Sequence, residues 1–584
     1  MRVVLVALNA RYIHSNLAIR YLKNNCQVPG VEIAIREYSI NEHPDDIAGD
    51  VLALEPDVAG FSCYIWNIEL VRRVARRVKL ISPRTVVVFG GPEVSFDPAQ
   101  ELAANPAVDM VVYGEGEETF RELVLSLKDG REDYNSVAGL AWRGVRGPRV
   151  NPPRELLPLE KIKPPYQSPA DIPEDKIVYY ETSRGCPFRC AYCLSSLTPG
   201  VRYLPLERVR QEIAALVAAG VEQVKLVDRT FNCHRQRALE IMKYIVSLGG
   251  NTRFHFEAAG DLFDQEMLDF LTQEVPAGLF ELEIGVQSTN PAVLERVGRR
   301  TDFVVFAEAV SRLRRAGNIH LHLDLIAGLP GEDVSSCYRS FDDVYRFRPH
   351  FLQPGFLKLL KGSSLRERAE EYGYKYVDEP PYEVLASKWL PYWEMRQLKK
   401  VEEVVEKIYN SGLFAFTLEY LLTLFSSPSA MYRQMVALWE ERNFFHKKPG
   451  AKDLFNFLYS FGLASGGREE VLAELLSLDW VAAGMRGALP FIRQEEEGKI
   501  LRDEEFISYH LPELTPLSPR ERGKTVVGVP VGAATVAWLM GGDWYVREGL
   551  ELRLKEQKEG LVIFFRTKKH PVTGRLQGVV IPRP

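Results

Sequence analysis

Arg184-Gly185-Cys186-Pro187-Phe188-Arg189-Cys190-Ala191-Tyr192-Cys193 carries three cysteines in the spacing C-x3-C-x2-C, just past an apolar run that contains two tyrosines. Each thiolate can ligate one iron of a 4Fe-4S cube, so Cys186, Cys190 and Cys193 would hold three irons and leave the fourth open. An open metal position is where a substrate can bind, as in catalytic metal sites generally. The spacing therefore predicts an iron–sulfur cluster with a catalytic role.

Two other sites are compatible with these cysteines. A zinc site would need a fourth ligand, for which Cys233 and His234 are candidates. Alternatively, Cys190 and Cys193 form a C-x-x-C pair that could act as a redox couple. The sequence contains no second C-x-x-C, and aromatic residues flank the loop, which weighs against both alternatives.

In this loop the chain resembles the radical S-adenosylmethionine (SAM) superfamily, in which an aromatic residue, here Tyr192, precedes the last cysteine. The resemblance implies that the amino and carboxylate groups of SAM bind the open iron. It also implies that an electron from the cluster cleaves SAM to a 5′-deoxyadenosyl radical.

Length and composition limit the class of protein. A chain of 584 residues is too long for one core and predicts three or four domains. Its 46% hydrophobic and 26% charged residues are typical of a soluble globular protein, and no stretch approaches a membrane span. Three of the seven cysteines are clustered, so we expect no disulfide framework and a cytoplasmic location. The net charge of −5 gives no general attraction to nucleic acid.

Residues 1–130 alternate apolar runs, beginning with Val3–Leu8, with helical stretches. Strands buried on both faces and joined by helices predict an α/β domain with a doubly wound parallel sheet. Ligands of such sheets bind at the carboxyl ends of the strands. Four segments should lie there, and their glycines would let the backbone approach a ligand, although ordinary turns have the same composition. These segments are residues 9–16, 62–67, 90–93 and 114–117.

Together with the cysteine loop, these segments resemble the cobalamin-binding domain that precedes some radical SAM barrels. The chain lacks the D-x-H-x-x-G motif of the cobalamin mutases and methionine synthase. The resemblance therefore implies base-off cobalamin without a histidine ligand, with His14 left as an alternative axial ligand. The implied cobalamin contacts are Tyr12, His14, Ser15, Asn16, Ser62, Tyr64, Trp66, Asn67, Gly90, Gly91, Pro92, Glu93, Gly114, Glu115 and Gly116.

Residues 131–175 hold eight prolines between positions 148 and 173, which predicts an extended linker without regular helix or strand. Residues 176–375 then repeat strand and helix about six times, as in a partial (β/α)6 barrel with its chemistry at the strand carboxyl ends. The resemblance to radical SAM barrels makes Asp228 and Glu257 candidate catalytic residues; a salt-bridged loop and a surface ion pair are their respective alternatives. It implies SAM contacts at Tyr192, Glu283, Gly285, Gln287, Gly328 and Pro330.

Residues 376–510 carry apolar residues at helical spacing and predict a helical domain. Residues 511–584 are predicted to be a β-rich tail, with short strands at 525–529, 535–538, 550–554 and 561–565. The whole arrangement resembles a subgroup of cobalamin-dependent radical SAM proteins with an uncharacterised helical C-terminal domain.

The resemblance implies an enzyme that methylates an unactivated carbon of a small molecule or peptide, or modifies it by a non-methylating rearrangement or cyclisation. An external reductant of the flavodoxin or ferredoxin type would supply the electron. The same chemistry on a tRNA nucleoside is a second hypothesis, supported by Lys568 and Lys569 and by a basic helix with Arg72, Arg73, Arg76, Arg77 and Lys79. A non-catalytic cobalamin sensor is a third. The substrate and the oligomeric state stay open.

Overall fold

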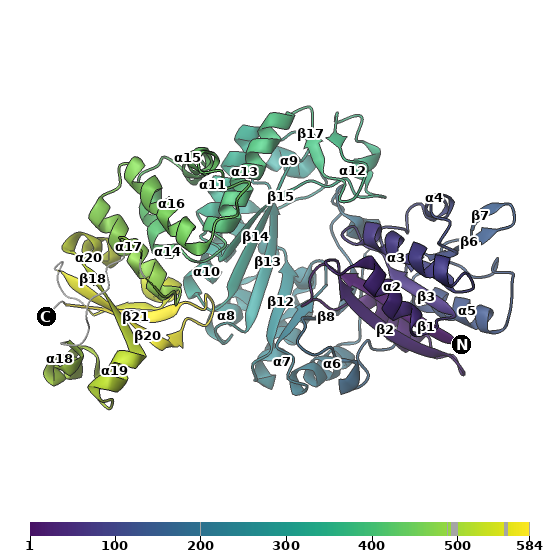
Figure 1. Ribbon diagram of the computed structural model, residues 1–584, viewed down its shortest axis with the longest axis horizontal. Helices are drawn as coiled ribbons and strands as arrows, with labels where there is room; N and C mark the ends of the chain where they lie inside the picture. Colours follow the sequence, from purple (N-terminus) through teal and green to yellow (C-terminus); the bar gives the residue numbers. More distant parts are fainter. Residues whose placement is uncertain (199, 488, 492–499, 554–558, 583–584) are drawn as a thin grey trace. The chain divides into compact units, whose positions relative to one another are not determined.

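The computed structural model describes residues 1–198, 200–487, 489–491, 500–553 and 559–582 (Figure 1). The chain divides into two compact units. Met1–Ala259, Val297–Arg299 and Leu357–Lys388 make up the first, and Gly260–Arg296, Arg300–Phe356 and Trp389–Pro584 the second. Among the described helices, none has the length and apolar character needed to cross a membrane.

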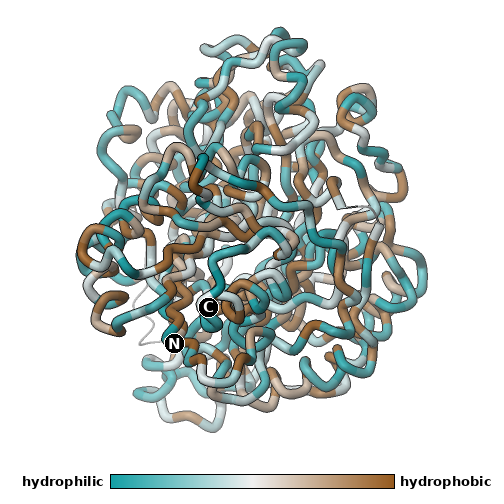
Figure 2. The backbone as a smooth tube through the Cα atoms, turned by 90° about the vertical axis from the view of Figure 1, so that its right-hand side faces the viewer, coloured by the Kyte–Doolittle hydropathy of each residue, from teal (hydrophilic) through white to brown (hydrophobic). Residues whose placement is uncertain are grey.

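The first unit contains a seven-stranded sheet in the order β2-β1-β3-β4-β5-β6-β7. Its first five strands run parallel: β1 (Arg2–Asn9), β2 (Glu32–Ser39), β3 (Val58–Ser62), β4 (Val86–Gly90) and β5 (Met110–Val112). The apolar run of β1, which begins near the N label in Figure 2, is buried from Val3 to Leu8.

Helices cover both faces of this sheet. Residues of α1 (Leu17–Asn25) and α5 (Glu117–Lys128) share one apolar core with the strands. Residues of α2 (Pro44–Leu52), α3 (Ile68–Ile81) and α4 (Pro98–Ala104) share the other. The predicted doubly wound α/β architecture is confirmed, because helices cover both faces of the sheet. Burial of both faces also explains why the strands appear in the sequence as continuous apolar runs.

Two antiparallel strands, β6 (Leu140–Gly144) and β7 (Gly147–Val150), extend the sheet beyond β5. The prediction that residues 131–175 contain no regular strand is therefore wrong for 140–150. Pro148 lies in β7, which is the edge strand, so its missing N–H removes no bond from the interior of the sheet. Of the later prolines, Pro158 precedes the 3-10 turn Leu159–Lys161, and Pro169 begins the 3-10 turn Pro169–Asp171.

Six further parallel strands follow, three in each unit. The first unit holds β8 (Val178–Tyr180), β11 (Gln223–Leu226) and β12 (Arg253–Ala258), with α6 (Leu206–Ala218) and α7 (Arg235–Leu248) between them. The second holds β13 (Phe280–Gln287), β14 (His320–Ala327) and β15 (Phe351–Phe356), with α8 (Gln265–Gln273), α9 (Pro291–Arg296), α10 (Phe303–Ala316) and α11 (Val334–Tyr345). These are the strand–helix repeats that the sequence predicts.

The second unit continues into a helical region, as predicted. It contains α13 (Tyr392–Ile408), α14 (Ala415–Leu422), α15 (Pro428–Glu441), α16 (Ala451–Ala464) and α17 (Glu469–Ala482). The segment Leu357–Lys388 belongs to the first unit. It contains α12 (Ser364–Glu367), β16 (Lys375–Tyr376) and β17 (Val384–Ala386).

The tail contains a four-stranded sheet in the order β18-β20-β21-β19. Its strands are β18 (Val526–Val531), β19 (Leu550–Leu552), β20 (Gly560–Lys569) and β21 (Leu576–Pro582). Helices α18 (Glu504–His510), α19 (Pro519–Thr525), α20 (Ala533–Met540) and α21 (Trp544–Glu548) accompany it. The strand expected at 535–538 is instead part of α20, whose buried residues Thr535, Val536 and Leu539 follow helical spacing. The last residue of the strand expected at 550–554 lies outside the described residues.

Candidate active site

The cysteine loop of the first unit lies between β9 (Ser183–Gly185) and β10 (Val201–Tyr203), which pair antiparallel. The backbone N–H of Ala191 donates to the carbonyl of Val297 (2.9 Å), and the carbonyl of Ala191 accepts from the N–H of Leu365 (2.9 Å). A Cβ added at Gly298 would lie 2.8 Å from the carbonyl oxygen of Arg189. Segments distant in sequence thus hold the loop closely on both sides.

All three cysteines of the loop are free thiols; Cys190 is buried, and Cys186 and Cys193 are partly exposed. Burial raises the pKa of the Cys190 thiol, although the guanidinium of Arg299 beside it acts in the opposite direction. Three thiols on one backbone-held loop are a donor set that fits three irons of a 4Fe-4S cluster.

The residues considered as a fourth zinc ligand have other partners. The sulfur of Cys233 lies 3.3 Å from the hydroxyl of Tyr203. The Nδ1 atom of His234 accepts from the N–H of Arg237, so this ring caps the start of α7. These contacts favour the three-cysteine site over a zinc site.

Asp228 lies just after β11 and is buried. Its carboxylate accepts from the N–H of Thr182 (2.8 Å), the hydroxyl of Thr182 (2.7 Å) and the hydroxyl of Ser183. Burial raises the pKa of Asp228 to about 6, while these hydrogen bonds lower it. The carboxylate therefore anchors the backbone that leads into the cysteine loop. Glu257, the other predicted catalytic carboxylate, is partly buried on β12.

A cavity of about 820 Å³ lies at the carboxyl ends of the parallel strands of the first sheet. All four predicted segments contribute to its wall, as the position of ligands on such sheets requires. The predicted cobalamin contacts that line it are His14, Ser15, Asn16, Ser62, Tyr64, Trp66, Gly90, Gly91, Pro92, Gly114, Glu115 and Gly116.

A second wall of this cavity comes from residues near the cysteine loop. Leu194 and Ser195 directly follow Cys193, Tyr179 lies in β8, and Arg229 follows β11. The cavity of the N-terminal sheet therefore adjoins the cysteine loop within one unit. The sequence carries no signal for this wall beyond the positions of Tyr179, in the run that forms β8, and of Arg229, after β11.

Three predicted cobalamin contacts do not line the cavity. Tyr12 is 68% exposed, with the ammonium of Lys176 over its ring. The amide of Asn67 donates to the carbonyls of Leu8 and Ser62. Glu93 accepts from the hydroxyl of Tyr382 and pairs with Lys361 (2.9 Å). The polar groups of Asn67 and Glu93 therefore stabilise the fold through these contacts.

Gly91 fixes the shape of the cavity where β4 ends. Its φ is +124°, and an added Cβ would lie 2.5 Å from the carbonyl oxygen of Cys63. We expect Gly91→Ala to destabilise the first unit by at least about 2 kcal/mol and to impair cobalamin retention, since it adds both strain and a clash. Thermal melting and the absorbance of bound cobalamin after desalting measure both effects.

Gly147→Ala is the matched control. Gly147 also has a positive φ, of +116°, but an added Cβ would meet nothing within 4 Å. Equal loss of cobalamin in the two variants would show that the close contact at Gly91 is unimportant.

An ionic cluster joins the cysteine loop to the Gly114–Glu117 segment. The guanidinium of Arg184 pairs with Glu117 (2.6 Å), Glu181 (2.7 Å) and Glu115 (3.6 Å). Glu115 also pairs with Arg202 on β10. Arg184 and all three carboxylates line the cavity, so this cluster sets the charge of one of its walls.

The predicted SAM contacts Glu283, Gly285, Gln287, Gly328 and Pro330 lie in the second unit. Gln287 ends β13 with a φ of +70°, where the register against β14 shifts. Its Oε1 atom is buried and has no hydrogen-bond partner among the described residues. A strained residue with such an atom is a good candidate for a ligand contact. Gly328 has a φ of +97° and, like Pro330, is buried.

Glu332, just after this segment, is 1% exposed and accepts from the hydroxyl of Ser288 at 2.6 Å. Burial raises its pKa from the usual 4.5 to about 7. The folded state therefore holds a proton that the unfolded chain releases, so the stability this group contributes is present below pH 4.5 and lost as pH rises through about 7.

We expect Glu332→Gln to remove this pH dependence, which amounts to about 3 kcal/mol. The melting temperature of the wild type should fall more steeply from pH 5 to pH 8 than that of the variant. Glu295→Gln, which changes an exposed glutamate of α9, should leave the wild-type slope. Parallel slopes in the wild type and Glu332→Gln would contradict the assignment.

Three protein families match the chain. The B12 binding domain matches residues 3–124, the radical SAM superfamily residues 180–344, and a family of unknown function, DUF4080, residues 370–526. The first two ranges contain the cavity segments and the cysteine loop, respectively.

Among curated proteins, the chain is 30% identical to an uncharacterized methyltransferase of Pyrococcus horikoshii, over 49% of this chain and 63% of that protein. It is also 30% identical to the cobalamin-dependent radical SAM methyltransferase TokK of Streptomyces tokunonensis, over 56% of this chain and 51% of TokK. The chain thus spans between half and two thirds of the length of these two relatives.

Among solved structures, the cobalamin-dependent SAM radical enzyme OxsB, with aqua-cobalamin and SAM bound, shares the fold. The TM-score is 0.57 at 16% identity, covering 88% of this chain and 81% of OxsB. The chain thus carries a B12 binding domain, a radical SAM domain and a C-terminal DUF4080 domain in this order, and it is similar to cobalamin-dependent radical SAM methyltransferases.

Proposed function

We propose that this protein is a cobalamin-dependent radical SAM methyltransferase that acts on an unactivated carbon. The observation that carries the proposal is the shared wall in the first unit, where Leu194 and Ser195 continue from Cys193 into the cavity of the N-terminal sheet. A methyl donor in that cavity would lie beside the residues that ligate a cluster.

Cys186, Cys190 and Cys193 would hold the cluster, and the twelve predicted cavity residues would hold cobalamin. The bound cluster supplies the electron that cleaves SAM, and bound cobalamin supplies the methyl group. The protein positions both groups and excludes water from the cavity, whose wall is mainly apolar on the side of Leu5, Val88 and Phe89.

We further propose that cobalamin binds without a histidine ligand. His14 is the histidine that lines the cavity, and its Nδ1 atom lies 2.7 Å from the hydroxyl of Tyr179. Burial lowers the pKa of His14, which favours the neutral ring. The hydrogen bond gives His14 a role in joining the first sheet to β8.

The proposed substrate is a small molecule or peptide, and the proposed electron source an external flavodoxin or ferredoxin. The tRNA hypothesis has less support, because two of the four arginines of α3 form ion pairs within the fold. Arg72 pairs with Glu101 and Glu69, and Arg77 pairs with Asp45.

The test is anaerobic reconstitution with iron, sulfide and hydroxocobalamin, followed by SAM and a reductant. Formation of both 5′-deoxyadenosine and S-adenosylhomocysteine would support a radical methyltransferase. 5′-Deoxyadenosine alone, with cobalamin bound, would favour a non-methylating radical reaction. Failure to retain cobalamin would overturn the assignment of the cavity.

A further inference from the structure

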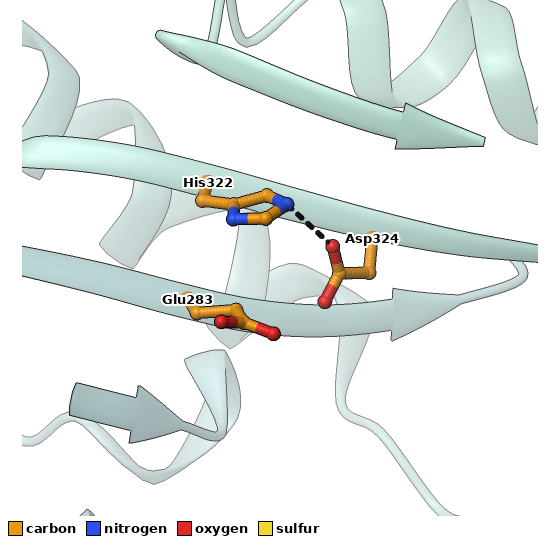
Figure 3. Close-up of side chains that lie close together, drawn as sticks. All are labelled: Glu283, His322 and Asp324. Atoms are coloured by element: carbon orange, nitrogen blue, oxygen red, sulfur yellow. Dashed lines mark ion pairs between the residues drawn. The ribbon is translucent and has the colours of Figure 1, made fainter. Parts of the chain in front are cut away.

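We propose that Glu283, His322 and Asp324 bind one first-row divalent metal cation, at a site built from residues other than the three cysteines. The three side chains lie on two neighbouring strands of the second unit (Figure 3). The proposal adds a metal site to the second unit and does not depend on the methyl-transfer reaction.

The register of β13 and β14 brings these residues to one place. Glu283 is directly opposite His322, and Gly285 is opposite Asp324. Alternate residues of a strand face the same side, so His322 and Asp324 share the face on which Glu283 lies. Gly285, which is opposite Asp324, adds no side chain on that face. Figure 3 shows the imidazole and the two carboxylates turned toward one another.

The distances suit ligation of one cation. One ligand atom from each residue lies within 4.8 Å of the others. The Nε2 atom of His322 is 2.8 Å from an oxygen of Asp324. Two ligand atoms that are each about 2.1 Å from a metal and at right angles would be about 3.0 Å apart. The spacing of this pair therefore requires little movement on binding.

The surroundings of this pair also favour a cation. Nε2 of His322 and Oδ1 of Asp324 are both buried and form an ion pair with each other, and neither makes a hydrogen bond with any other described residue. Buried polar atoms normally have a partner, and one cation would satisfy both. The ring of Phe351 packs edge-on against His322, with centroids 4.5 Å apart, and restricts its orientation.

The ligand set indicates which metals fit. Imidazole suits zinc, iron, nickel and copper, whereas carboxylates also accept manganese. One imidazole with two carboxylates therefore favours Mn²⁺, Fe²⁺ or Zn²⁺ over Mg²⁺ and Ca²⁺, which prefer oxygen ligands alone. Three protein ligands leave coordination positions open for water or for an oxygen of a substrate.

Mn²⁺ is the appropriate probe, because neither an iron–sulfur cluster nor cobalamin contains manganese. The reconstituted full-length protein would be titrated anaerobically with Mn²⁺ while electron paramagnetic resonance measures the free ion. We expect saturable binding of one Mn²⁺ per chain. Glu283→Gln and His322→Gln should each weaken the affinity by about tenfold to a hundredfold or more.

Glu281→Gln is the matched control. Glu281 lies on the same face of β13, opposite His320, and pairs with that histidine at 3.5 Å. The control removes a similar charge without removing a proposed ligand, so it should retain Mn²⁺ affinity within a few fold. Cys190→Ala should also retain it, which would exclude binding at the cysteine loop.

Absence of saturable binding in the wild type, with near-native circular dichroism, would overturn the proposal and leave His322 and Asp324 as an ion pair. Equal affinity in the wild type and His322→Gln would overturn it as well. Assay of 5′-deoxyadenosine in the same samples separates this question from the proposed reaction. Loss of SAM cleavage in Glu283→Gln without any Mn²⁺ binding in the wild type would assign Glu283 to SAM instead.

Discussion

Replacing Cys190 by alanine is expected to abolish 5′-deoxyadenosine formation, with a loss of at least about a thousandfold, because two remaining thiolates cannot hold the cluster in place. Cys190 is the most buried of the three cysteines, and its loop is fixed by backbone hydrogen bonds at Ala191. Iron and sulfide content, the absorbance of the reconstituted protein and product analysis measure the loss. Retention of cobalamin would show that the first unit still folds.

Cys233→Ala is the control for this experiment. The thiol of Cys233 contacts the hydroxyl of Tyr203. The variant should therefore keep iron content and SAM cleavage near those of the wild type. If Cys233→Ala removed the metal as completely as Cys190→Ala, the site would have four protein ligands. That result would favour the closed zinc site over an open cluster.

Much of the first unit could be predicted because its signals are local. The continuous apolar runs identify strands that are buried on both faces, and the residues after them fall at one edge of the sheet. Most of the residues predicted at that edge line the cavity. Residue type and position do not give the direction of a side chain, however. Asn67 and Glu93 lie in segments that contribute to the cavity wall, but their side chains bond elsewhere. Asn67 donates to two backbone carbonyls, and Glu93 accepts from the hydroxyl of Tyr382.

The second wall of the cavity could not be predicted, since it depends on how segments far apart in sequence pack together. Tyr179 and Arg229 carry no motif of their own. The metal site has a similar origin: the alternation of His322 and Asp324 is visible in the sequence, but their register against Glu283 is not. In the tail, the strand predicted at 535–538 is wrong: the run belongs to α20, because a short apolar run does not by itself distinguish a strand from a buried helix.

Arg184→Met is expected to destabilise the region around the cysteine loop by about 3–5 kcal/mol, because it leaves buried carboxylates without their cation. The side chain of Arg184 is 16% exposed and that of Glu117 8% exposed, so water compensates little for the lost pair. Amide hydrogen exchange of β9 and of residues 114–117 would measure the local free energy of opening. Cobalamin affinity should also fall, because these carboxylates line the cavity.

A second substitution separates the effect of the unpaired carboxylates from the effect of the lost side-chain volume. Adding Glu117→Gln to Arg184→Met removes one stranded charge, and it should restore at least about 1 kcal/mol of local stability. By contrast, Arg121→Met breaks a pair with Glu118 in which the side chains are 38% and 31% exposed, and it should cost less than about 1 kcal/mol. If the two arginine variants had similar effects, the cluster at Arg184 would be a surface ion pair in energetic terms. If Glu117→Gln deepened the loss instead, Glu117 would stabilise the loop through contacts other than its charge.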